Sequence, residues 1–146
     1  MRTFPWSDSL MIGHPRIDAD HQMLLERIGT IEEILESGEM TEALAGEYRA
    51  LVAFLIEHCR YEEELMHRLP ERYHARVAEH CRNHGLLLAE TRSMDVLLRP
   101  GADRVYGLKR FQSVVVGMTR DLILDDVELV GLLLRERRLE GGAPPS

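Results

Sequence analysis

Histidines and carboxylates recur at helical spacing in two segments of the chain. His58 and Glu62 stand four residues apart, and so do His80 and His84. Residues at that spacing lie above one another on one face of a helix, where they can hold the same ion or ion pair. Each pair falls among apolar residues, and burying imidazole or carboxylate groups is costly unless they have partners. The spacing therefore favours a metal site between helices.

A third segment adds His21, which also lies on an apolar stripe. One buried histidine, or one His-x-x-x-Glu pair, is more often a hydrogen-bonded or solvent-exposed feature than a ligand. Three such coincidences on three apolar faces make metal binding the stronger interpretation. Imidazole and carboxylate ligands without thiolates suit iron, manganese or zinc, and the facing helices of a bundle commonly carry carboxylate-bridged pairs of metal ions.

Four long helices are needed to position these residues, and apolar residues spaced by three and four predict them. We expect the helices close to residues 15–37, 41–68, 70–98 and 103–139. Pro15 suits a first helical turn, Gly38 ends the first helix, and Thr41 is a suitable N-cap for the second. The predicted fold class is all-α: an up-down-up-down four-helix bundle with an N-terminal loop and a disordered C-terminal tail. Residues 1–140 form the one domain and residues 141–146 the tail.

The composition excludes several classes of partner. The chain has 18 basic and 25 acidic residues among 146, a formal net charge of -7 that repels phosphate backbones and anionic lipid surfaces. We therefore expect no nucleic-acid partner and no membrane partner. No apolar run approaches the ~20 residues that span a bilayer, and the first residues lack a signal-peptide pattern, so we expect a cytoplasmic location. Cys59 and Cys81 are too few for a disulfide framework and are expected to be free thiols.

Three stretches of the chain resemble the hemerythrin family. They are Phe4-Pro5-Trp6 with Ile12-Gly13 and Ile17-Asp18-Ala19-Asp20-His21, then His58-Cys59-Arg60-Tyr61-Glu62-Glu63-Glu64-Leu65-Met66, then His80-Cys81-Arg82-Asn83-His84. They follow the order of the family and span the first three predicted helices. The resemblance implies a non-haem, carboxylate-bridged di-iron centre, with two iron ions as cofactor and dioxygen as ligand.

The resemblance also implies a role for each matching position. His21 and His58 would bind the iron ion that keeps an open coordination place for dioxygen. His80 and His84 would bind the other iron ion, and Glu62 would bridge the two.

The fourth helix departs from the family pattern. Asp126 would be the second bridging carboxylate, although Asp125 also points inward and is an alternative. The family has a histidine five residues before this aspartate, and this chain has Asp121 there. Three outcomes are open: Asp121 binds metal and favours the ferric state, it does not bind and leaves a water-ligated iron ion, or the site holds a single metal or a metal other than iron.

The remaining histidines are expected to serve the fold. His67 and His74 belong to the polar stretch around Arg68 to Arg76, and His14 precedes the first helix. We expect surface or capping roles for them rather than metal binding.

The leading functional hypothesis is a dioxygen-binding protein for storage, delivery or sensing, more a binding protein than an enzyme. Its ligand would be dioxygen or another small diatomic molecule or peroxide, in a dry pocket formed by Met118, Leu122, Phe54 and Leu25. One alternative is a di-iron redox enzyme or scavenger that reduces peroxide, nitric oxide or oxygen. Another is a structural bundle whose metal site has decayed. Nothing in the sequence indicates a protein partner.

Overall fold

The structure is a computed structural model that describes residues 2–38 and 40–141, with the backbone alone described for residues 121, 140 and 141. Four long helices dominate these residues: α1 (Pro15–Ser37), α2 (Glu42–His67), α3 (His74–Ser93) and α4 (Arg104–Gly141). Three short 3₁₀ segments accompany them: η1 (Asp8–Leu10), η2 (Glu71–Tyr73) and η3 (Asp95–Leu98). The described ranges contain no strand. The predicted all-α fold is confirmed.

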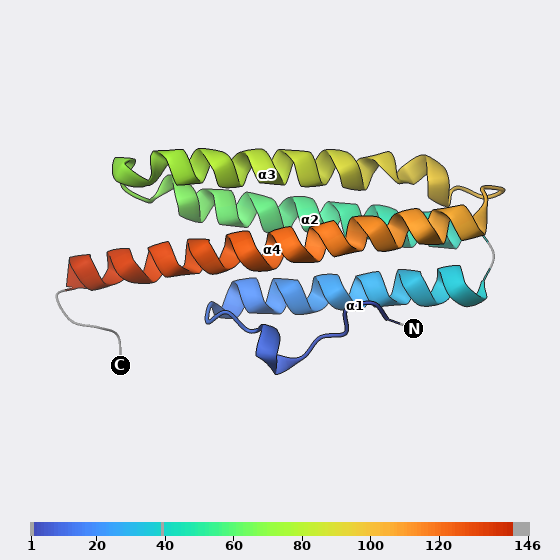
Figure 1. Ribbon diagram of the computed structural model, residues 1–146, viewed down its shortest axis with the longest axis horizontal. Helices are drawn as coiled ribbons and strands as arrows, with labels where there is room; N and C mark the ends of the chain where they lie inside the picture. Colours follow the sequence, from blue (N-terminus) through green and yellow to red (C-terminus); the bar gives the residue numbers. More distant parts are fainter. Residues whose placement is uncertain (1, 39, 142–146) are drawn as a thin grey trace.

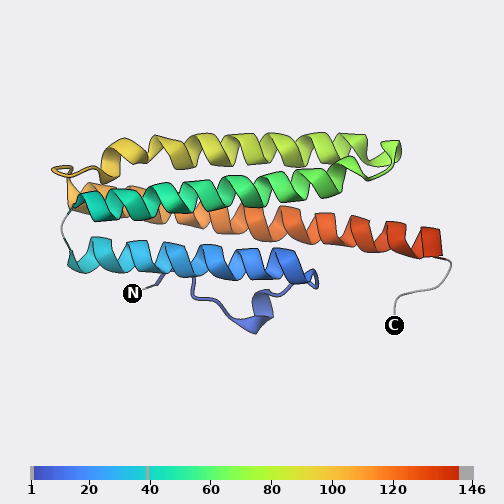
Figure 2. The same cartoon turned by 180° about the vertical axis from the view of Figure 1, so that it is seen from behind.

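The helices form an up-down-up-down bundle, as predicted. Successive helices run in opposite directions, and α4 extends beyond the others at the end nearest the C-terminus (Figure 1). Helix α1 packs against α2 and α4, and α3 packs against the same two helices, so α1 and α3 lie diagonally (Figures 1 and 2). None of the described helices is long and apolar enough to cross a membrane.

Local signals set the ends of the first two helices. Helix α1 spans the predicted residues, and the Nδ1 atom of His14 accepts a hydrogen bond from the backbone N–H of Ile17 at 3.3 Å. The capping role expected for His14 is therefore confirmed. Thr41 caps α2 in the same way, because its hydroxyl oxygen accepts from the N–H of Leu44 at 3.2 Å.

The third predicted helix is shorter than expected, because a 3₁₀ segment replaces each end. At its start, Pro70 has an extended ψ of 156°, and the turn that follows buries Tyr73, whose hydroxyl donates to Glu136 of α4 at 3.0 Å. At its end, Met94 and Leu98 are both buried. Both side chains belong to the larger apolar cluster of the core.

Helix α4 begins and ends within two residues of the predicted bounds. Gly141, assigned to the tail by the sequence, is its last residue, and residues 142–146 lie outside the described part of the chain.

The apolar core consists of two clusters separated by a layer of buried polar side chains. The larger cluster includes Leu51 and Phe111, and the smaller includes Met66 and Leu129. On each long helix, the buried histidine or carboxylate lies between the residues given to one cluster and those given to the other. The bundle therefore supports a polar layer from both sides.

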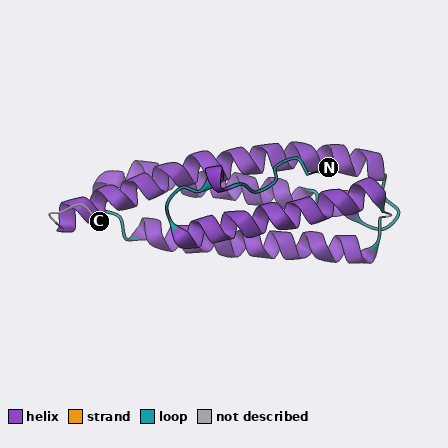
Figure 3. Ribbon diagram, turned by 90° about the horizontal axis from the view of Figure 1, so that it is seen from below, coloured by secondary structure: helices purple, strands orange, loops and turns teal. Residues whose placement is uncertain are grey.

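The N-terminal segment, residues 2–14, runs along the outside of the bundle beside α1 (Figures 1 and 3). The hydroxyl of Thr3 donates to the buried carboxylate of Glu32 at 2.5 Å. The backbone N–H of Ile12 donates to buried Asp18 at 2.8 Å. These two carboxylates of α1 are thus occupied in holding the segment to the bundle.

Candidate metal centre

The polar layer contains one or two side chains from each long helix. They are His21 of α1, His58 and Glu62 of α2, His80 and His84 of α3, and Asp126 of α4. All are buried, with exposed fractions between 0% and 7%. The structure thus brings together six of the seven residues that the sequence singled out as candidate ligands.

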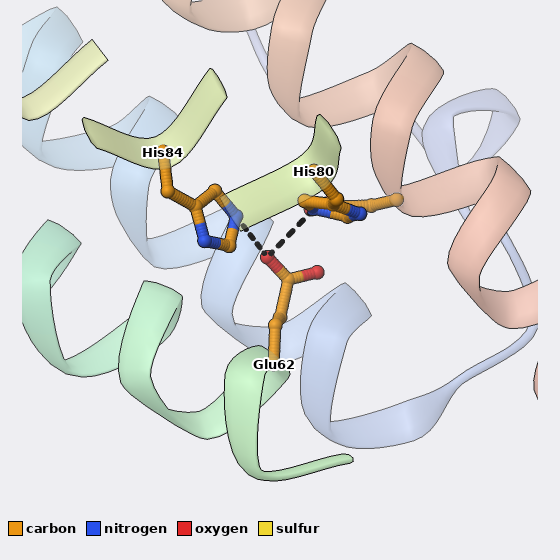
Figure 4. Close-up of side chains that lie close together, drawn as sticks. Glu62, His80 and His84 are labelled. Atoms are coloured by element: carbon orange, nitrogen blue, oxygen red, sulfur yellow. Dashed lines mark hydrogen bonds and ion pairs between the residues drawn. The ribbon is translucent and has the colours of Figure 1, made fainter. Parts of the chain in front are cut away.

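Glu62 lies among the histidines of α2 and α3. Its Oε1 atom is 3.2 Å from Nε2 of His84 and 3.9 Å from Nε2 of His80, and Figure 4 shows the carboxylate pointing from α2 toward both rings. The same oxygen is 3.2 Å from Nε2 of His58. One carboxylate group therefore contacts histidines of both α2 and α3.

Asp126 has a similar position, approached from α4. Its Oδ2 atom is 2.6 Å from Nε2 of His21 and 3.3 Å from Nε2 of His58. Its Oδ1 atom is 3.2 Å from Nε2 of His80. Asp126 therefore contacts histidines of α1, α2 and α3, and it shares His58 and His80 with Glu62.

The side chains form two groups that could each hold a metal ion. In each group, one ligand atom from every residue lies within 4.8 Å of the others; the groups are Glu62, His80, His84 and Asp126, and His21, His58 and Asp126. Asp126 belongs to both.

Four buried polar atoms in the layer make no hydrogen bond of good geometry, which tests whether the residues fit a metal. They are Oε2 of Glu62, Nε2 of His80, Nδ1 of His84 and Oδ1 of Asp126. Nε2 of His80 and Oδ1 of Asp126 are in ion-pair contact at 3.2 Å, and Nδ1 of His84 lies 3.5 Å from Oε1 of Glu63. Almost all buried polar atoms in proteins are satisfied, so four exceptions in one layer need an explanation. Imidazole nitrogens and carboxylate oxygens are ligands for iron, manganese or zinc. The layer fits a metal-binding role.

Without metal, the surroundings of His58 and His80 favour the charged form of each ring. Burial alone would lower the pKa of His58, but hydrogen bonds to Asp126 and Asp20, together with Glu62, raise it to about 11. Burial also opposes protonation of His80, whose pKa is nevertheless raised by Asp126 and Glu62.

The pKa of Asp126 shifts in the opposite direction. Burial would raise it, but hydrogen bonds from His21, His58 and His80 hold it well below its ordinary value. In the metal-free layer, the charged forms of His58 and His80 and the ionised form of Asp126 thus stabilise one another.

Asp20 is a buried neighbour of the layer to which the sequence analysis gave no role. It is buried, and its Oδ2 atom is 3.0 Å from Nδ1 of His58, on the opposite side of the ring from Glu62 and Asp126. A carboxylate in that position fixes the orientation and tautomer of a metal-binding histidine. A signal was present, because Asp20 stands three residues after Ile17 and therefore lies on the apolar stripe of α1.

Helix α4 carries two other aspartates, Asp125 and Asp121. Asp125 accepts a hydrogen bond from the side-chain amide of Asn83 at 3.0 Å and is outside both groups. Of Asp125 and Asp126, it is Asp126 that contacts the histidines. The backbone of Asp121 is helical, but its side chain lies outside the described part of the structure, so its role as a ligand stays a prediction.

The remaining histidines and both cysteines stand outside the layer. His67 is exposed and donates from Nδ1 to the backbone carbonyl of Glu63 at 2.5 Å. His74 is exposed at the first position of α3. Cys59 is buried and Cys81 partly buried, both as free thiols whose pKa is raised by burial. These positions agree with the structural roles expected from the sequence.

An apolar cavity adjoins the layer at His21. Its lining comes from the N-terminal segment, α1 and α4, and consists of Trp6, Leu10, His21, Leu24, Leu25, Thr119, Leu122 and Ile123. Its free volume is about 10 Å³, close to the least that accommodates one water-sized molecule. Leu25 and Leu122 line it as predicted. Phe54 and Met118, which were also expected there, instead pack in the larger apolar cluster.

A second opening reaches the layer from the other side, between α3 and α4. Its free volume is about 60 Å³, and His80 lies in its wall. Its rim carries Asn83 and Asp125, together with Arg76 and Glu128, whose charged groups are 3.8 Å apart. The two approaches to the layer therefore differ in character: one is apolar and narrow, the other polar and wider.

No family model, curated protein or solved structure matches the chain. What its own geometry defines is an all-α four-helix bundle with a buried group of histidines and carboxylates that could hold a metal ion. The identity of the metal, the number of ions and the ligand are inferences from that geometry and from the hemerythrin resemblance of the sequence.

Proposed function

We propose that the chain is a hemerythrin-like, non-haem di-iron protein that binds dioxygen or a similarly small ligand. One observation carries the proposal: Glu62 lies within 3.3 Å of histidines from two helices and Asp126 within 3.3 Å of histidines from three, so both could bridge two metal ions. In simple structural ion pairs, each histidine would have a carboxylate of its own. Here two carboxylates are shared among four histidines, and this sharing suits two metal ions.

Each residue of the layer would have a distinct role in binding the two ions. His80 and His84 would hold one iron ion, His21 and His58 the other, and the carboxylates of Glu62 and Asp126 would lie between them. When bound, a pair of ferrous ions supplies the electrons for reversible dioxygen binding.

Asp20 would keep the Nδ1 atom of His58 protonated, so that Nε2 faces the metal. The hydrogen bond of 3.0 Å between Asp20 and His58 supports this role.

The apolar cavity beside His21 supports ligand binding on that side of the layer. Leu24, Leu25 and Leu122 form much of its wall and offer no proton donor. A wall of this kind admits a small neutral molecule and keeps bulk water away. Because proton delivery is restricted, reversible binding is favoured over reduction of the ligand.

Metal analysis of protein from iron-replete cells tests the proposal. We expect two iron ions per chain, and a charge-transfer absorption band when the reduced protein meets air. Glu62→Gln should lose iron, whereas the matched control Glu32→Gln should keep both ions, because Glu32 is equally buried but binds Thr3 outside the layer. Well under one iron ion per chain in the parent protein would refute the proposal and support a decayed site.

Asp121 is tested by substitution with histidine. If Asp121 is a ligand, Asp121→His should keep two iron ions and slow autoxidation, because imidazole favours the ferric state less than carboxylate does. Unchanged autoxidation and iron content would mean that Asp121 does not bind metal.

A second candidate function, redox turnover, has one observation in its favour. The polar opening between α3 and α4 brings solvent-accessible side chains to the wall beside His80. Protons could reach the layer from that side, as reduction of peroxide, nitric oxide or oxygen would require. Sustained consumption of peroxide or nitric oxide under reducing conditions would select this function over reversible binding.

A further inference from the structure

Thr119 of α4 carries a buried hydroxyl group without a partner. The residue is 6% exposed, and its Oγ1 atom makes no hydrogen bond. A threonine within a helix can donate to the carbonyl group four residues earlier. Thr91 of α3 does so, donating to the carbonyl of Leu87 at 2.7 Å. Because a buried, unsatisfied hydroxyl group destabilises a protein, Thr119 requires an explanation that Thr91 does not.

The position of Thr119 supplies that explanation. Thr119 and His21 both line the apolar cavity, and the rest of the wall is formed by leucine and isoleucine side chains and Trp6. The free space between them is about 10 Å³, the size of one water molecule. Any molecule that fills it lies against the candidate metal-binding histidine on one side and close to the free hydroxyl group on another.

We propose that Thr119 donates a hydrogen bond to the ligand of the metal centre and selects small anions or diatomic molecules that have an acceptor atom at their far end. The inference rests on the proposed function, because it requires a ligand bound beside His21. It adds a specificity-determining residue that an entirely apolar pocket would lack.

The chemistry of the hydroxyl group suits this role. It rotates about the Cβ–Oγ1 bond and can direct its proton toward a newly bound acceptor. Hydrogen bonds to charged acceptors are about twice as strong as those between neutral groups, and a cavity of low dielectric constant strengthens them further. The group is thus poorly satisfied in the free protein and well satisfied with ligand.

The first test uses the metal-free protein and needs no ligand. Thr119→Val replaces the hydroxyl group by a methyl group of similar size, and should raise the Tm by roughly 2–4 °C. The matched control is Thr91→Val, which removes a hydroxyl group that is satisfied, and should lower the Tm. A fall in Tm for Thr119→Val similar to that for Thr91→Val would overturn the claim that the Thr119 hydroxyl lacks a partner.

The second test measures ligand affinity in the iron-loaded, oxidised protein by optical titration with azide. Thr119→Val should weaken azide binding roughly tenfold or more. Thr119→Ser keeps a hydroxyl group and should retain most of the affinity. Azide binding of equal strength in the parent and the valine variant would overturn the inference and leave the proposed function standing. A parent protein that takes up no metal would overturn both.

Discussion

Replacing Asp20 with alanine tests whether His58 is a metal ligand whose ring is oriented by the hydrogen bond at Nδ1. The Oδ2 atom of Asp20 lies 3.0 Å from Nδ1 of His58, and loss of such a partner typically weakens metal binding 10- to 100-fold. That range corresponds to about 1.4–2.7 kcal/mol of binding free energy. The other partner of Asp20 is Arg16, whose side chain is 56% exposed, so losing that ion pair contributes little.

Asp18 provides a matched control for this experiment. It lies two residues earlier on α1 and is also buried, but it accepts hydrogen bonds from the backbone N–H groups of Ile12 and Gly13. Asp18→Ala should therefore lower the stability of the metal-free and metal-loaded forms alike and leave metal affinity unchanged. Asp20→Ala should lower the affinity itself.

Competition for Co²⁺ against a chromophoric chelator measures the affinity of each variant. An independent measurement is the rise in Tm on metal loading, which should be smaller by about 3–11 °C in Asp20→Ala at saturating metal. The reasoning is refuted if Asp20→Ala binds Co²⁺ within twofold of the parent, or if Asp18→Ala weakens binding by as much.

Three further predictions follow from the layer and its supports. Metal uptake at pH 7 should release protons, and metal affinity should rise with pH. The raised pKa values of His58 and His80 favour the charged rings in the metal-free protein, whereas ligation needs neutral imidazole. An indicator dye measures the protons released, and no release would argue against these ligands. Removing metal with a chelator should lower the Tm but preserve the helical circular dichroism signal, because two apolar clusters support the bundle independently of metal; loss of the signal would contradict this. Thr41→Ala should cost about 1 kcal/mol of unfolding free energy by removing the N-cap of α2, with metal content unchanged in the same preparation.

The parts of the fold that depend on local chemistry were predictable from the sequence. Helix α1 begins at Pro15 and ends before Gly38, as these two residues predict. The start and the end of a helix depend on the backbone preferences of a few residues. The ends of α3 were not predictable in this way. Burial of Tyr73 against α4 and of Met94 in the core decides them, and both are contacts between helices.

The same distinction applies to the candidate site. Spacing within one helix reveals the pairs His58–Glu62 and His80–His84, because i and i+4 share a face. No spacing encodes the contact of Asp20 with His58, which crosses from α1 to α2. The prediction of Asp126 depended on the family resemblance, since Asp126 and His21 stand 105 positions apart in the sequence and meet only in the folded chain.

That separation between His21 and Asp126 has a consequence for folding kinetics. The first and last helices both contribute to the layer, so the complete set of ligands exists only once α4 has packed against α1. Contacts between residues so distant in sequence form late, because the loop they close is long. Metal bound by the complete set should therefore stabilise the native state more than the folding transition state. We expect bound metal to slow unfolding and to leave the folding rate nearly unchanged. The ion would then add kinetic stability to the folded bundle.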